Sequence, residues 1–329
     1  MAAKITGIGH YTPETIITNH YFIEKGLDTS NDWIVERTGI HQRRFNKPNS
    51  GSSELSHKAS LKCLDNAKLS PEDLDLIIVA TSTPDHLSFP STACILQEKL
   101  NCKNTPAFDL SAACSGFCFA LSTAENYLLN DNYKHILVVG VDCLSSITNL
   151  NDRKTAILFG DGAGAVILTK TNTKNSGIIY SKMYSNGTHK DILKIPEGGS
   201  KSPINPEVTK NESHYIHMDG KAVFKSAINT TVPAIKEALN SVNLSTNDIS
   251  YLICHQANKR IIDNIALKLK IPNEKVIINL DKYGNTSAAS IPLAMSEFND
   301  TIGFKKGDIL VLVGFGAGFT WGVNIVIWE

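Results

Sequence analysis

The sequence has no excess charge of either sign, because its 32 lysines and arginines are balanced by 32 aspartates and glutamates. Proteins that bind nucleic acid or an anionic membrane surface usually carry a strong basic excess. The balance therefore argues against both classes, although it is compatible with a local basic patch. The composition is otherwise ordinary for a globular protein, and 329 residues correspond to about two domains or one large α/β unit.

The cysteines form no paired motif. There are seven, an odd number, and no two are spaced as C-x-x-C. The opening residues, MAAKITGIGHYTP, also lack the charged-then-apolar pattern of a signal peptide. Both features favour free thiols in a reducing compartment over a disulfide framework, so we expect a cytoplasmic protein.

The glycine-rich segments do not fit a membrane span or a nucleotide-binding loop. Residues 309–328 are apolar and long enough to cross a bilayer, but their four glycines and many β-branched residues predict two buried strands joined by a turn. The runs GDGAG (160–164) and GFGAG (314–318) lead into β-like segments, whereas a phosphate-binding loop opens a helix. We therefore expect no membrane insertion and no bound NAD or nucleoside triphosphate.

The chain contains an internal repeat. LSPEDLDLIIVATS begins at residue 69, and LSTNDISYLICHQA begins 175 residues later, at residue 244. Three further pairs follow at similar offsets: SAAC (111–114) with SAAS (287–290), HILVVG (135–140) with DILVLVG (308–314) and, more loosely, FGDGAGAVIL (159–168) with FGAGFTWGVNIVI (315–327). We therefore predict two related halves, residues 1–172 and 173–329.

Each half alternates buried strands with amphipathic helices. In the first half we expect helices over 52–69 and 111–130, and strands over 74–82, 105–110 and 134–142. Such alternation predicts a mainly parallel sheet covered on both faces, and two such halves packed together give a layered α/β fold. Ligand sites in these sheets gather at the carboxyl ends of the strands. The polar stretch 184–213 is expected to be a loop excursion.

Cys114, in FDLSAACSGFCFALS (108–122), is the candidate nucleophile. A buried cysteine is more often a packing residue, and this interpretation fits Cys118, one helical turn further on. Cys114, however, follows a predicted strand and lies in the first turn of a predicted helix. The helix dipole and a nearby histidine can lower the pKa of a thiol in that position.

His255 and Asn285 are the candidate partners of Cys114. His255 follows the strand that repeats 77–80, and Asn285 precedes the segment that repeats the cysteine helix. Both are therefore expected at strand ends facing Cys114. Imidazole and carboxamide can both donate hydrogen bonds to a developing oxyanion, and no carboxylate lies beside these motifs in the sequence. A thiolate with two donors and no carboxylate base suits a carbanion formed by decarboxylation.

Seven ordered motifs resemble the β-ketoacyl-ACP synthase III family of the thiolase superfamily. They are SNDWIVERTGIHQRR (30–44), DLSAACSGF, DRKTAILFGDGAGAV (152–166), HMDGKAVFK (217–225), HQANKRI, YGNTSAASIP and GFGAGFTWG. The resemblance implies a duplicated five-layer thiolase fold (α-β-α-β-α), a homodimer and a Cys114–His255–Asn285 triad. It implies an enzyme that takes an acyl group from acyl-CoA onto Cys114 and condenses it with malonyl-ACP, which starts fatty-acid synthesis. Both thioesters are substrates, and no metal or cofactor is expected.

The resemblance also assigns roles to other positions. The backbone N–H groups of Cys114 and Ala317 would form a second oxyanion hole, and Phe89 and Phe315 would shape the acyl pocket, with Phe89 reaching across the dimer. CoA and its pantetheine arm would contact Trp33, Arg37, Arg153, Met218, Gly220, Phe224 and Asn258. Acyl carrier protein would dock on Gln256, Ala257, Asn258, Lys259 and Arg260, where basic side chains complement an acidic carrier.

Two positions depart from the family pattern. Lys154 replaces a glycine, which puts the CoA phosphate contacts in doubt, and Ala317 stands where glycine is common, which matters only if that residue needs a positive φ. Neither belongs to the triad.

Several alternatives remain open. Papain-like proteases use Cys, His and Asn in the same order, with Asn orienting His. A specialised relative could use an unusual acyl starter or another nucleophile in secondary metabolism, and a degenerate member could bind without catalysis. Thiolase and HMG-CoA synthase branches need a second cysteine or a glutamate that the sequence does not locate.

Overall fold

Two β-sheets organise the fold, and each takes its strands from one part of the chain. The computed structural model describes residues 2–173 and 176–329. The first sheet has the order β1 (Ala2–Tyr11), β7 (Asp161–Thr171), β6 (His135–Cys143), β4 (Leu76–Ala80), β5 (Ala107–Leu110). The second has the order β11 (Tyr251–Cys254), β12 (Ile309–Gly316), β13 (Thr320–Ile327), β8 (Gly177–Ser185). The predicted boundary between residues 172 and 173 stays a prediction.

Both sheets are mixed, so the expectation of a mainly parallel sheet is wrong. β4 is parallel to β5 and β6, and β11 is parallel to β12, but the remaining ladders are antiparallel. Only three residues join β12 to β13, which is too short for a crossover and forces an antiparallel hairpin. This hairpin is the pair of buried strands expected from residues 309–328.

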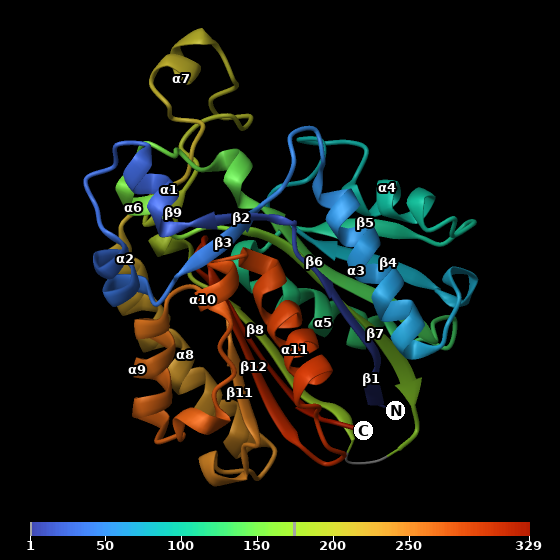
Figure 1. The fold of residues 1–329 in the computed structure, drawn as a ribbon. Coiled ribbons are helices and arrows are strands. Elements are labelled where there is room, and N and C mark those ends of the chain that lie inside the picture. Colours follow the sequence, from blue (N-terminus) through green and yellow to red (C-terminus); the bar gives the residue numbers. More distant parts are fainter. Residues whose placement is uncertain (1, 174–175) are drawn as a thin grey trace.

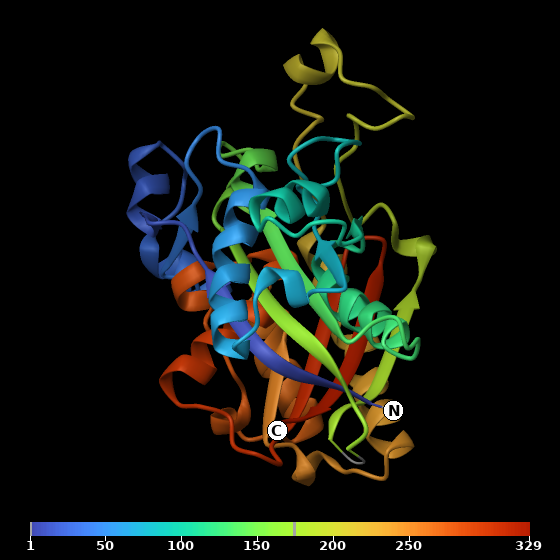
Figure 2. The ribbon, with the colours of Figure 1, turned by 90° about the vertical axis from the view of Figure 1, so that its right-hand side faces the viewer.

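Helices cover both sheets and fill the space between them, which gives five layers (Figures 1 and 2). α3 (Ser52–Ala67) and α4 (Thr92–Lys99) pack on the outer face of the first sheet. α5 (Gly116–Tyr127) and α11 (Ser290–Thr301) lie between the sheets and contact both. α8 (Gly220–Ser241) covers the outer face of the second sheet and packs against α9 (Lys259–Leu269).

The cores follow from this layering. Every residue of β4 is buried, as is all of β12 after Ile309, because each strand has a helix layer on both faces. One apolar cluster lies between the sheets and contains Phe117 of α5 and Met295 of α11, and each outer helix layer has a cluster of its own. This packing fixes the strand ends and thereby the residues that follow them.

The sequence repeat corresponds to equivalent local structures. The 3₁₀ turns η1 (Pro71–Asp73) and η5 (Thr246–Asp248) both begin with a Ser–Asp capping box and lead into β4 and β11. The turns η2 (Ala113–Ser115) and η7 (Ser287–Ala289) lead into α5 and α11, and both begin with a positive φ, 47° at Ala113 and 51° at Ser287. Ala113 is therefore structurally equivalent to Ser287, which lies 174 residues later (287 − 113). The alignment of SAAC with SAAS implied an offset of 176 residues (287 − 111), so that alignment is out of register by two residues.

Shorter elements surround one end of the layers. They are α1 (Asn19–Glu24), α2 (Asn31–Thr38), α6 (Arg153–Ala156), α10 (Leu280–Tyr283), and the paired strands β2 (Thr15–Thr18) with β3 (Gln42–Phe45) and β9 (Leu193–Lys194) with β10 (His217–Met218). The expected loop excursion 184–213 contains β9 and α7 (Pro206–Lys210), and α7 lies on an arm that projects from the layers (Figures 1 and 2). All seven cysteines are free, as predicted. No helix among the described residues is long and apolar enough to cross a membrane.

Candidate active site

Cys114 lies in the η2 turn between β5 and α5, and its side chain is buried. It therefore precedes the α-helix, whereas the sequence placed it in the first helical turn. The carboxyl end of β12 packs against this turn so closely that a Cβ atom at Gly316 would lie 2.6 Å from the Cys114 nitrogen. A glycine is needed there because any side chain would push the turn away.

His255 follows β11, and its imidazole is held from two sides. Its backbone N–H donates to Val313 of β12 (2.7 Å), and its ring packs edge-on against Phe315 with 5.1 Å between centroids. Nδ1 lies 2.7 Å from the Ser290 hydroxyl oxygen, which itself accepts from the Gln256 backbone N–H. Nδ1 is therefore engaged by Ser290, and in the tautomer in which the hydroxyl donates to it the ring proton lies on Nε2.

Asn285 is fixed by backbone and side chain alike. Its N–H and C=O each pair at 2.9 Å with the segment 158–160, and its Oδ1 accepts from the Ser287 N–H (2.9 Å). Because the amide oxygen is already occupied, the NH₂ group is the part of the side chain that remains to meet a ligand. Asn285 and His255 thus both present N–H donors.

Cys114, His255 and Asn285 line one cavity of about 110 Å³. The sequence expectation that these three residues meet is consistent with this geometry. Phe315 and Ala257 also line the cavity, and no carboxylate or second cysteine does so among the described residues. The described lining therefore offers no carboxylate to abstract a proton, which is compatible with a carbanion formed by loss of CO₂.

Burial sets the protonation states in the cavity. It raises the pKa of the Cys114 thiol to about 12 and lowers the pKa of the His255 imidazole to about 3. The expectation that the helix and histidine lower the thiol pKa is therefore wrong, because burial raises it. At neutral pH the site holds a thiol and a neutral imidazole.

The two N–H groups expected to form a second oxyanion hole are available. Neither Cys114 N–H, apart from its contact with its own sulfur, nor Ala317 N–H has an acceptor within residues 2–173 and 176–329. Ala317 is not among the residues with positive φ, so its Cβ causes no backbone strain there. The departure from glycine at this position is therefore harmless to the turn.

A larger cleft of about 1070 Å³ leads from the surface to the cavity. Both spaces share five lining residues, Leu158, Met218, Gly220, Phe224 and Asn258. Four of these are the positions expected to line a pantetheine tunnel. The shared lining makes the cavity the inner end of the cleft.

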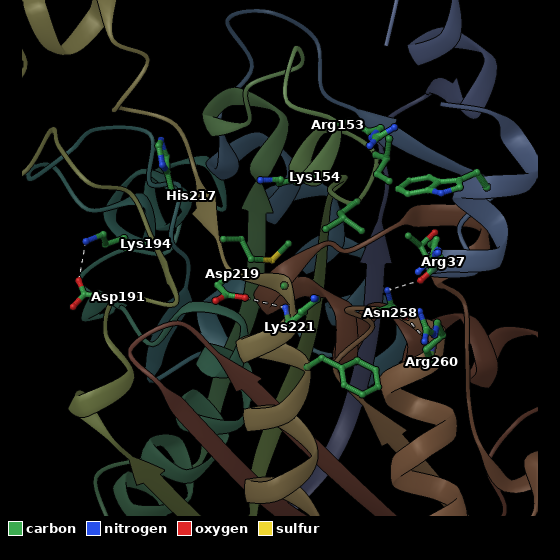
Figure 3. Close-up of a pocket in the computed structure, with 17 residues that line it drawn as sticks. Arg37, Arg153, Lys154, Asp191, Lys194, His217, Asp219, Lys221, Asn258 and Arg260 are labelled. Atoms are coloured by element: carbon green, nitrogen blue, oxygen red, sulfur yellow. Dashed lines mark hydrogen bonds and ion pairs between the residues drawn. The ribbon is translucent and has the colours of Figure 1, made fainter. Parts of the chain in front are cut away.

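Cations dominate the outer cleft (Figure 3). Its lining includes the cations Arg37, Arg153, Lys154, Lys194, Lys221 and Arg260, against two carboxylates, Asp191 and Asp219. Arg153 is paired with Asp28, and Lys194 with Asp191; the other four cations have no ion-pair partner in the described part of the chain. Unpaired cations in a cleft favour an anionic ligand.

Trp33 lines the cleft, and two guanidinium groups lie near its ring. The Arg153 group is 4.9 Å from the Trp33 ring centroid and the Arg37 group is 5.8 Å from it. Both arginines are exposed, and Arg153 occupies one face of the indole. A ligand ring that stacks on the face of Trp33 covered by Arg153 must first displace the Arg153 guanidinium.

Of the expected carrier-docking segment, Gln256 is placed wrongly. Its side chain is buried, donates to the carbonyls of Cys254 and Ile277 and accepts from the Asn279 N–H, so it cannot contact a docked protein. Ala257 lines the inner cavity. The five residues are contiguous in the sequence, which suggested one surface. Gln256 and Ala257, however, lie between β11 and α9 and are turned inward, and the helix begins only at Lys259.

The rest of the segment starts α9. Asn258 caps this helix through the Arg260 N–H and donates to the Arg37 carbonyl (3.0 Å). Lys259 and Arg260 are exposed; Lys259 pairs with Asp263, and the Arg260 guanidinium lies 5.9 Å from the Phe224 ring centroid. Arg260 is therefore the unpaired cation of this segment.

The two predicted acyl-pocket residues lie apart. Phe315 lines the inner cavity, whereas Phe89 is 86% exposed beside Leu87, which is 85% exposed, and lines neither the cavity nor the cleft of its own chain. Exposure of two large apolar side chains on one loop is typical of a surface that another protein covers.

Sequence reasoning missed three residues around the triad. Ser290 orients His255, Ser287 lies within hydrogen-bonding reach of the Cys114 thiol, and Asp142 lies close enough to act on that thiol electrostatically. The two serines sit in the motif YGNTSAASIP but have no spacing signature of their own. Asp142 ends a strand, 28 positions after Cys114, and no local pattern marks it. Among the described residues, no cluster of three metal-binding side chains occurs.

Comparisons with known proteins agree on one family. A family model described as 3-oxoacyl-(acyl-carrier-protein) synthase III matches residues 108–187, and its C-terminal companion matches residues 239–328. The β-ketoacyl-(acyl-carrier-protein) synthase III of Clostridioides difficile is 47% identical over 326 residues, which cover 99% of this chain and 98% of that protein.

Solved structures show the same likeness. The 3-oxoacyl-(acyl-carrier-protein) synthase III of Aquifex aeolicus is 41% identical, with a TM-score of 0.91 and coverage of 99% of this chain and 100% of that one. A priming β-ketosynthase from the R1128 polyketide biosynthetic pathway is 31% identical, with a TM-score of 0.91 and coverage of 100% and 96%.

Proposed function

The chain belongs to the 3-oxoacyl-(acyl-carrier-protein) synthase III family and has its thiolase fold, and from this premise we propose how its residues carry out the family's condensation. The protein is a condensing acyltransferase of fatty-acid synthesis. Acyl-CoA and malonyl-ACP are its proposed substrates. The convergence of Cys114, His255 and Asn285 on one cavity at the inner end of a cationic cleft is the observation that supports this most.

In the first half-reaction, the Cys114 sulfur attacks the thioester carbonyl of acyl-CoA. The S–C bond to Cys114 forms, the bond to CoA breaks, and the thiol proton ends on the departing CoA sulfur. The N–H groups of Cys114 and Ala317 stabilise the tetrahedral oxyanion, because preorganised donors cost no reorganisation when charge develops. CoA would lie along the cleft with its phosphates at the unpaired cations.

In the second half-reaction, malonyl-ACP enters the emptied tunnel and loses CO₂. The electron pair of the broken C–C bond becomes an enolate, whose oxygen accepts from His255 Nε2–H and Asn285 NH₂. The enolate carbon attacks the acyl thioester on Cys114. The tetrahedral intermediate then expels the Cys114 thiolate, which takes up one proton and returns to the resting thiol.

The protease alternative does not fit the contacts. In that chemistry an asparagine orients the catalytic histidine. Here Ser290 holds His255 Nδ1, and the Asn285 amide oxygen holds the Ser287 N–H. Asn285 therefore does not orient His255 as that chemistry requires.

A homodimer would complete the acyl pocket. The exposed Phe89 lies on a loop with no role in its own cavity, and a second copy would bring it to the partner's site, as the resemblance implies. Arg260 and Lys259 at the start of α9 would meet acyl carrier protein beside the cleft. We propose a cytoplasmic location, since both substrates are soluble thioesters, and no requirement for a cofactor.

The second candidate is a synthase that primes a specialised pathway with an unusual acyl starter. Its support is the likeness to the R1128 priming β-ketosynthase. The triad does not separate the two candidates, because starter choice depends on the shape of the acyl pocket. Incubation with a panel of acyl-CoAs and malonyl-ACP, followed by mass spectrometry of the ACP product, distinguishes them.

The proposal is tested by labelling with [¹⁴C]acetyl-CoA. The wild-type protein should take up about one acetyl group per chain, and Cys114→Ser should take up none. Cys118→Ser is the matched control, because Cys118 is buried one turn further on and lines neither space. Label that persists in Cys114→Ser contradicts the proposed nucleophile.

A further inference from the structure

Arg43 is a buried cation that the proposed mechanism does not use. It lies in β3, its side chain is fully buried, and it lines neither the cavity nor the cleft. Burial lowers its pKa to about 9, so the guanidinium is still charged at pH 7, and no carboxylate pairs with it among the described residues. Because an unpaired buried charge costs stability, an apolar side chain would serve better here if packing were its only role.

The guanidinium of Arg43 donates to neutral acceptors on three elements. Nη1 donates to Oδ1 of Asn19 in α1 (2.8 Å) and to the carbonyl of Ile17 in β2 (3.2 Å). Nη2 donates to the carbonyl of Ile157, which ends α6 (2.6 Å). The guanidinium carbon also lies 4.9 Å from the ring centroid of Phe22. Oxygen dipoles and an aromatic face thus compensate the charge, and the planar group spans parts of the chain that are far apart in sequence.

The Asn19 amide holds the guanidinium in place. The side chain of Asn19 is fully buried, and its Nδ2 donates to the Ile40 carbonyl (2.9 Å) and to Oδ1 of Asn31 (3.1 Å). Both amide protons are therefore used, and Oδ1 is the atom that meets Arg43. A side chain that positions another group must itself be held. Arg43 is held in this way by β2 and α1.

The contact with Ile157 leads to Asn285. Leu158, the next residue, accepts from the Asn285 N–H (2.9 Å), and the Gly160 N–H donates to the Asn285 carbonyl (2.9 Å). These two bonds belong to a parallel β-bridge, which sets the backbone position of Asn285. Arg43 therefore binds the residue that directly precedes this bridge.

The stem of Arg43 packs against both sides of the same bridge. A Cβ atom at Gly160 would lie 3.0 Å from the Arg43 Cβ, and one at Gly284, the residue before Asn285, would lie 3.1 Å from it. Gly284 also has a φ of 66°, where a side chain would be strained. The two glycines thus let Arg43 approach the bridge closely, and Asn285 cannot shift away from its bridge partner without losing these contacts.

We propose that Arg43 is a positioning residue for Asn285: through Ile157 and the two glycines it holds the 158–160 segment, and with it the Asn285 amide, where the enolate oxygen develops. The inference rests on the proposed function, which assigns that oxygen to Asn285. A preorganised donor loses its effect when it is displaced even slightly, so decarboxylation depends on Arg43. Acetyl transfer, which uses other N–H groups, does not.

A double-mutant cycle tests the coupling. Arg43→Met keeps an unbranched stem but removes the donors, and should lower kcat for malonyl-ACP decarboxylation about tenfold or more. In an Asn285→Ala background the same substitution should change that rate less than about twofold, because the amide that it positions is already absent. Release of ¹⁴CO₂, corrected for the enzyme-free rate, measures both. An equal loss in the two backgrounds overturns the proposal.

Acetyl transfer and a matched variant separate positioning from loosened packing. Acetyl labelling of Cys114 in Arg43→Met, at saturating acetyl-CoA, should stay within about twofold of the wild-type rate. Asp75→Ala removes a carboxylate that accepts from the N–H groups of Lys134 (2.7 Å) and His135 (2.8 Å) at the amino ends of β4 and β6. It should lower the unfolding temperature and leave decarboxylation unchanged. A tenfold loss of acetyl transfer in Arg43→Met, or of decarboxylation in Asp75→Ala, overturns the proposal.

Hydrogen exchange measures the position without activity. Relative to the amides of β4, the amide protons of Gly160 and Asn285 should exchange about tenfold faster in Arg43→Met than in the wild type, and should not do so in Asp75→Ala. Unchanged exchange in Arg43→Met overturns the proposal. Absence of decarboxylation in the wild-type protein would instead refute the proposed function, and the exchange result would still stand.

A second substitution serves if Arg43→Met does not fold. Arg43→Lys keeps the cation, but its single nitrogen cannot reproduce the separate bonds that Nη1 and Nη2 make to Asn19 and Ile157. The cycle and the exchange measurement are then run with Arg43→Lys. The same outcomes support or overturn the proposal, with an equal loss in both backgrounds again counting against it.

Discussion

The hydroxyl of Ser290 lies 2.7 Å from Nδ1 of His255, and this contact leaves Nε2 as the ring nitrogen without a partner among the described residues. The same hydroxyl oxygen accepts from the Gln256 N–H, and when the Ser290 hydroxyl donates to Nδ1 the ring proton lies on Nε2. A buried imidazole with an occupied Nδ1 and a protonated Nε2 is a hydrogen-bond donor. In that tautomer His255 would act as a hydrogen-bond donor, like the proposed role of Asn285.

The first prediction concerns these two donors. His255→Ala or Asn285→Ala should reduce malonyl-ACP decarboxylation roughly 10²- to 10³-fold, the usual effect of removing one oxyanion-hole donor. Acetyl transfer from acetyl-CoA should be reduced much less, because different N–H groups serve it. Separate assays of ¹⁴CO₂ release and of acetyl labelling measure the two steps. Equal losses in both would show that His255 and Asn285 act on Cys114 itself.

The second prediction concerns pH. Burial raises the pKa of Cys114 to about 12, so the thiolate fraction at pH 7 is below that of free cysteine, and deprotonation lies above neutrality. Iodoacetamide alkylation of Cys114 in the free enzyme should therefore keep rising from pH 7 to 10, by about tenfold per unit. A plateau below pH 8 would mean a preformed thiolate. Over the same range His255, whose pKa burial lowers to about 3, should contribute no inflection.

The third prediction concerns Arg260. A cation in the first turn of α9 is disfavoured by the helix dipole, so stability does not account for it. Arg260→Glu should raise KM for malonyl-ACP about five- to tenfold, through loss of charge complementarity, and leave unfolding temperature unchanged or slightly higher. Lys268→Glu, at the far end of the same helix, is the matched control. An unaltered KM for malonyl-ACP would remove Arg260 from the docking surface.

The fourth prediction concerns Lys154, which stands where a glycine is common in the family. Its exposed ammonium lines the outer cleft without an ion-pair partner among the described residues. Lys154→Met keeps the aliphatic stem and removes the charge, and should raise KM for acyl-CoA roughly three- to tenfold at low salt. The difference from wild type should shrink at high ionic strength. If KM is the same at low salt, Lys154 makes no phosphate contact.

The local features were predictable because short-range chemistry determines them. The strand that becomes β4, the helix that becomes α3 and the hairpin of β12 with β13 follow from apolar patterning and glycine placement. The internal repeat predicted that Cys114, His255 and Asn285 meet after strand ends, and the cavity contains all three; Cys114 and His255 follow β5 and β11, whereas Asn285 follows the helix α10. Strand direction was mispredicted, because the length of the connection between two strands decides whether they run parallel, and the apolar pattern does not show it. The three-residue connection of β12 to β13 is an example.

The details of the site could not be read from the sequence. Gln256 lies in a polar motif yet is buried, since its amide satisfies the carbonyls of Cys254 and Ile277. Asp142 is remote from every motif, and only packing of η7 against β6 brings it to Ala288. The pKa of Cys114 likewise depends on exclusion of water by residues from both sheets.

The amino-acid sequence by itself determined the duplicated pattern, the alternation of strands and helices, and the residue types able to form and stabilise a carbanion. Only the tertiary structure decided that Ser290 contacts the imidazole, that burial raises the pKa of the Cys114 thiol and that Asp142 accepts from the Ala288 N–H. The physical reason is that these properties depend on desolvation and on hydrogen bonds between residues distant along the chain. Such contacts exist only once the two sheets enclose the central helices.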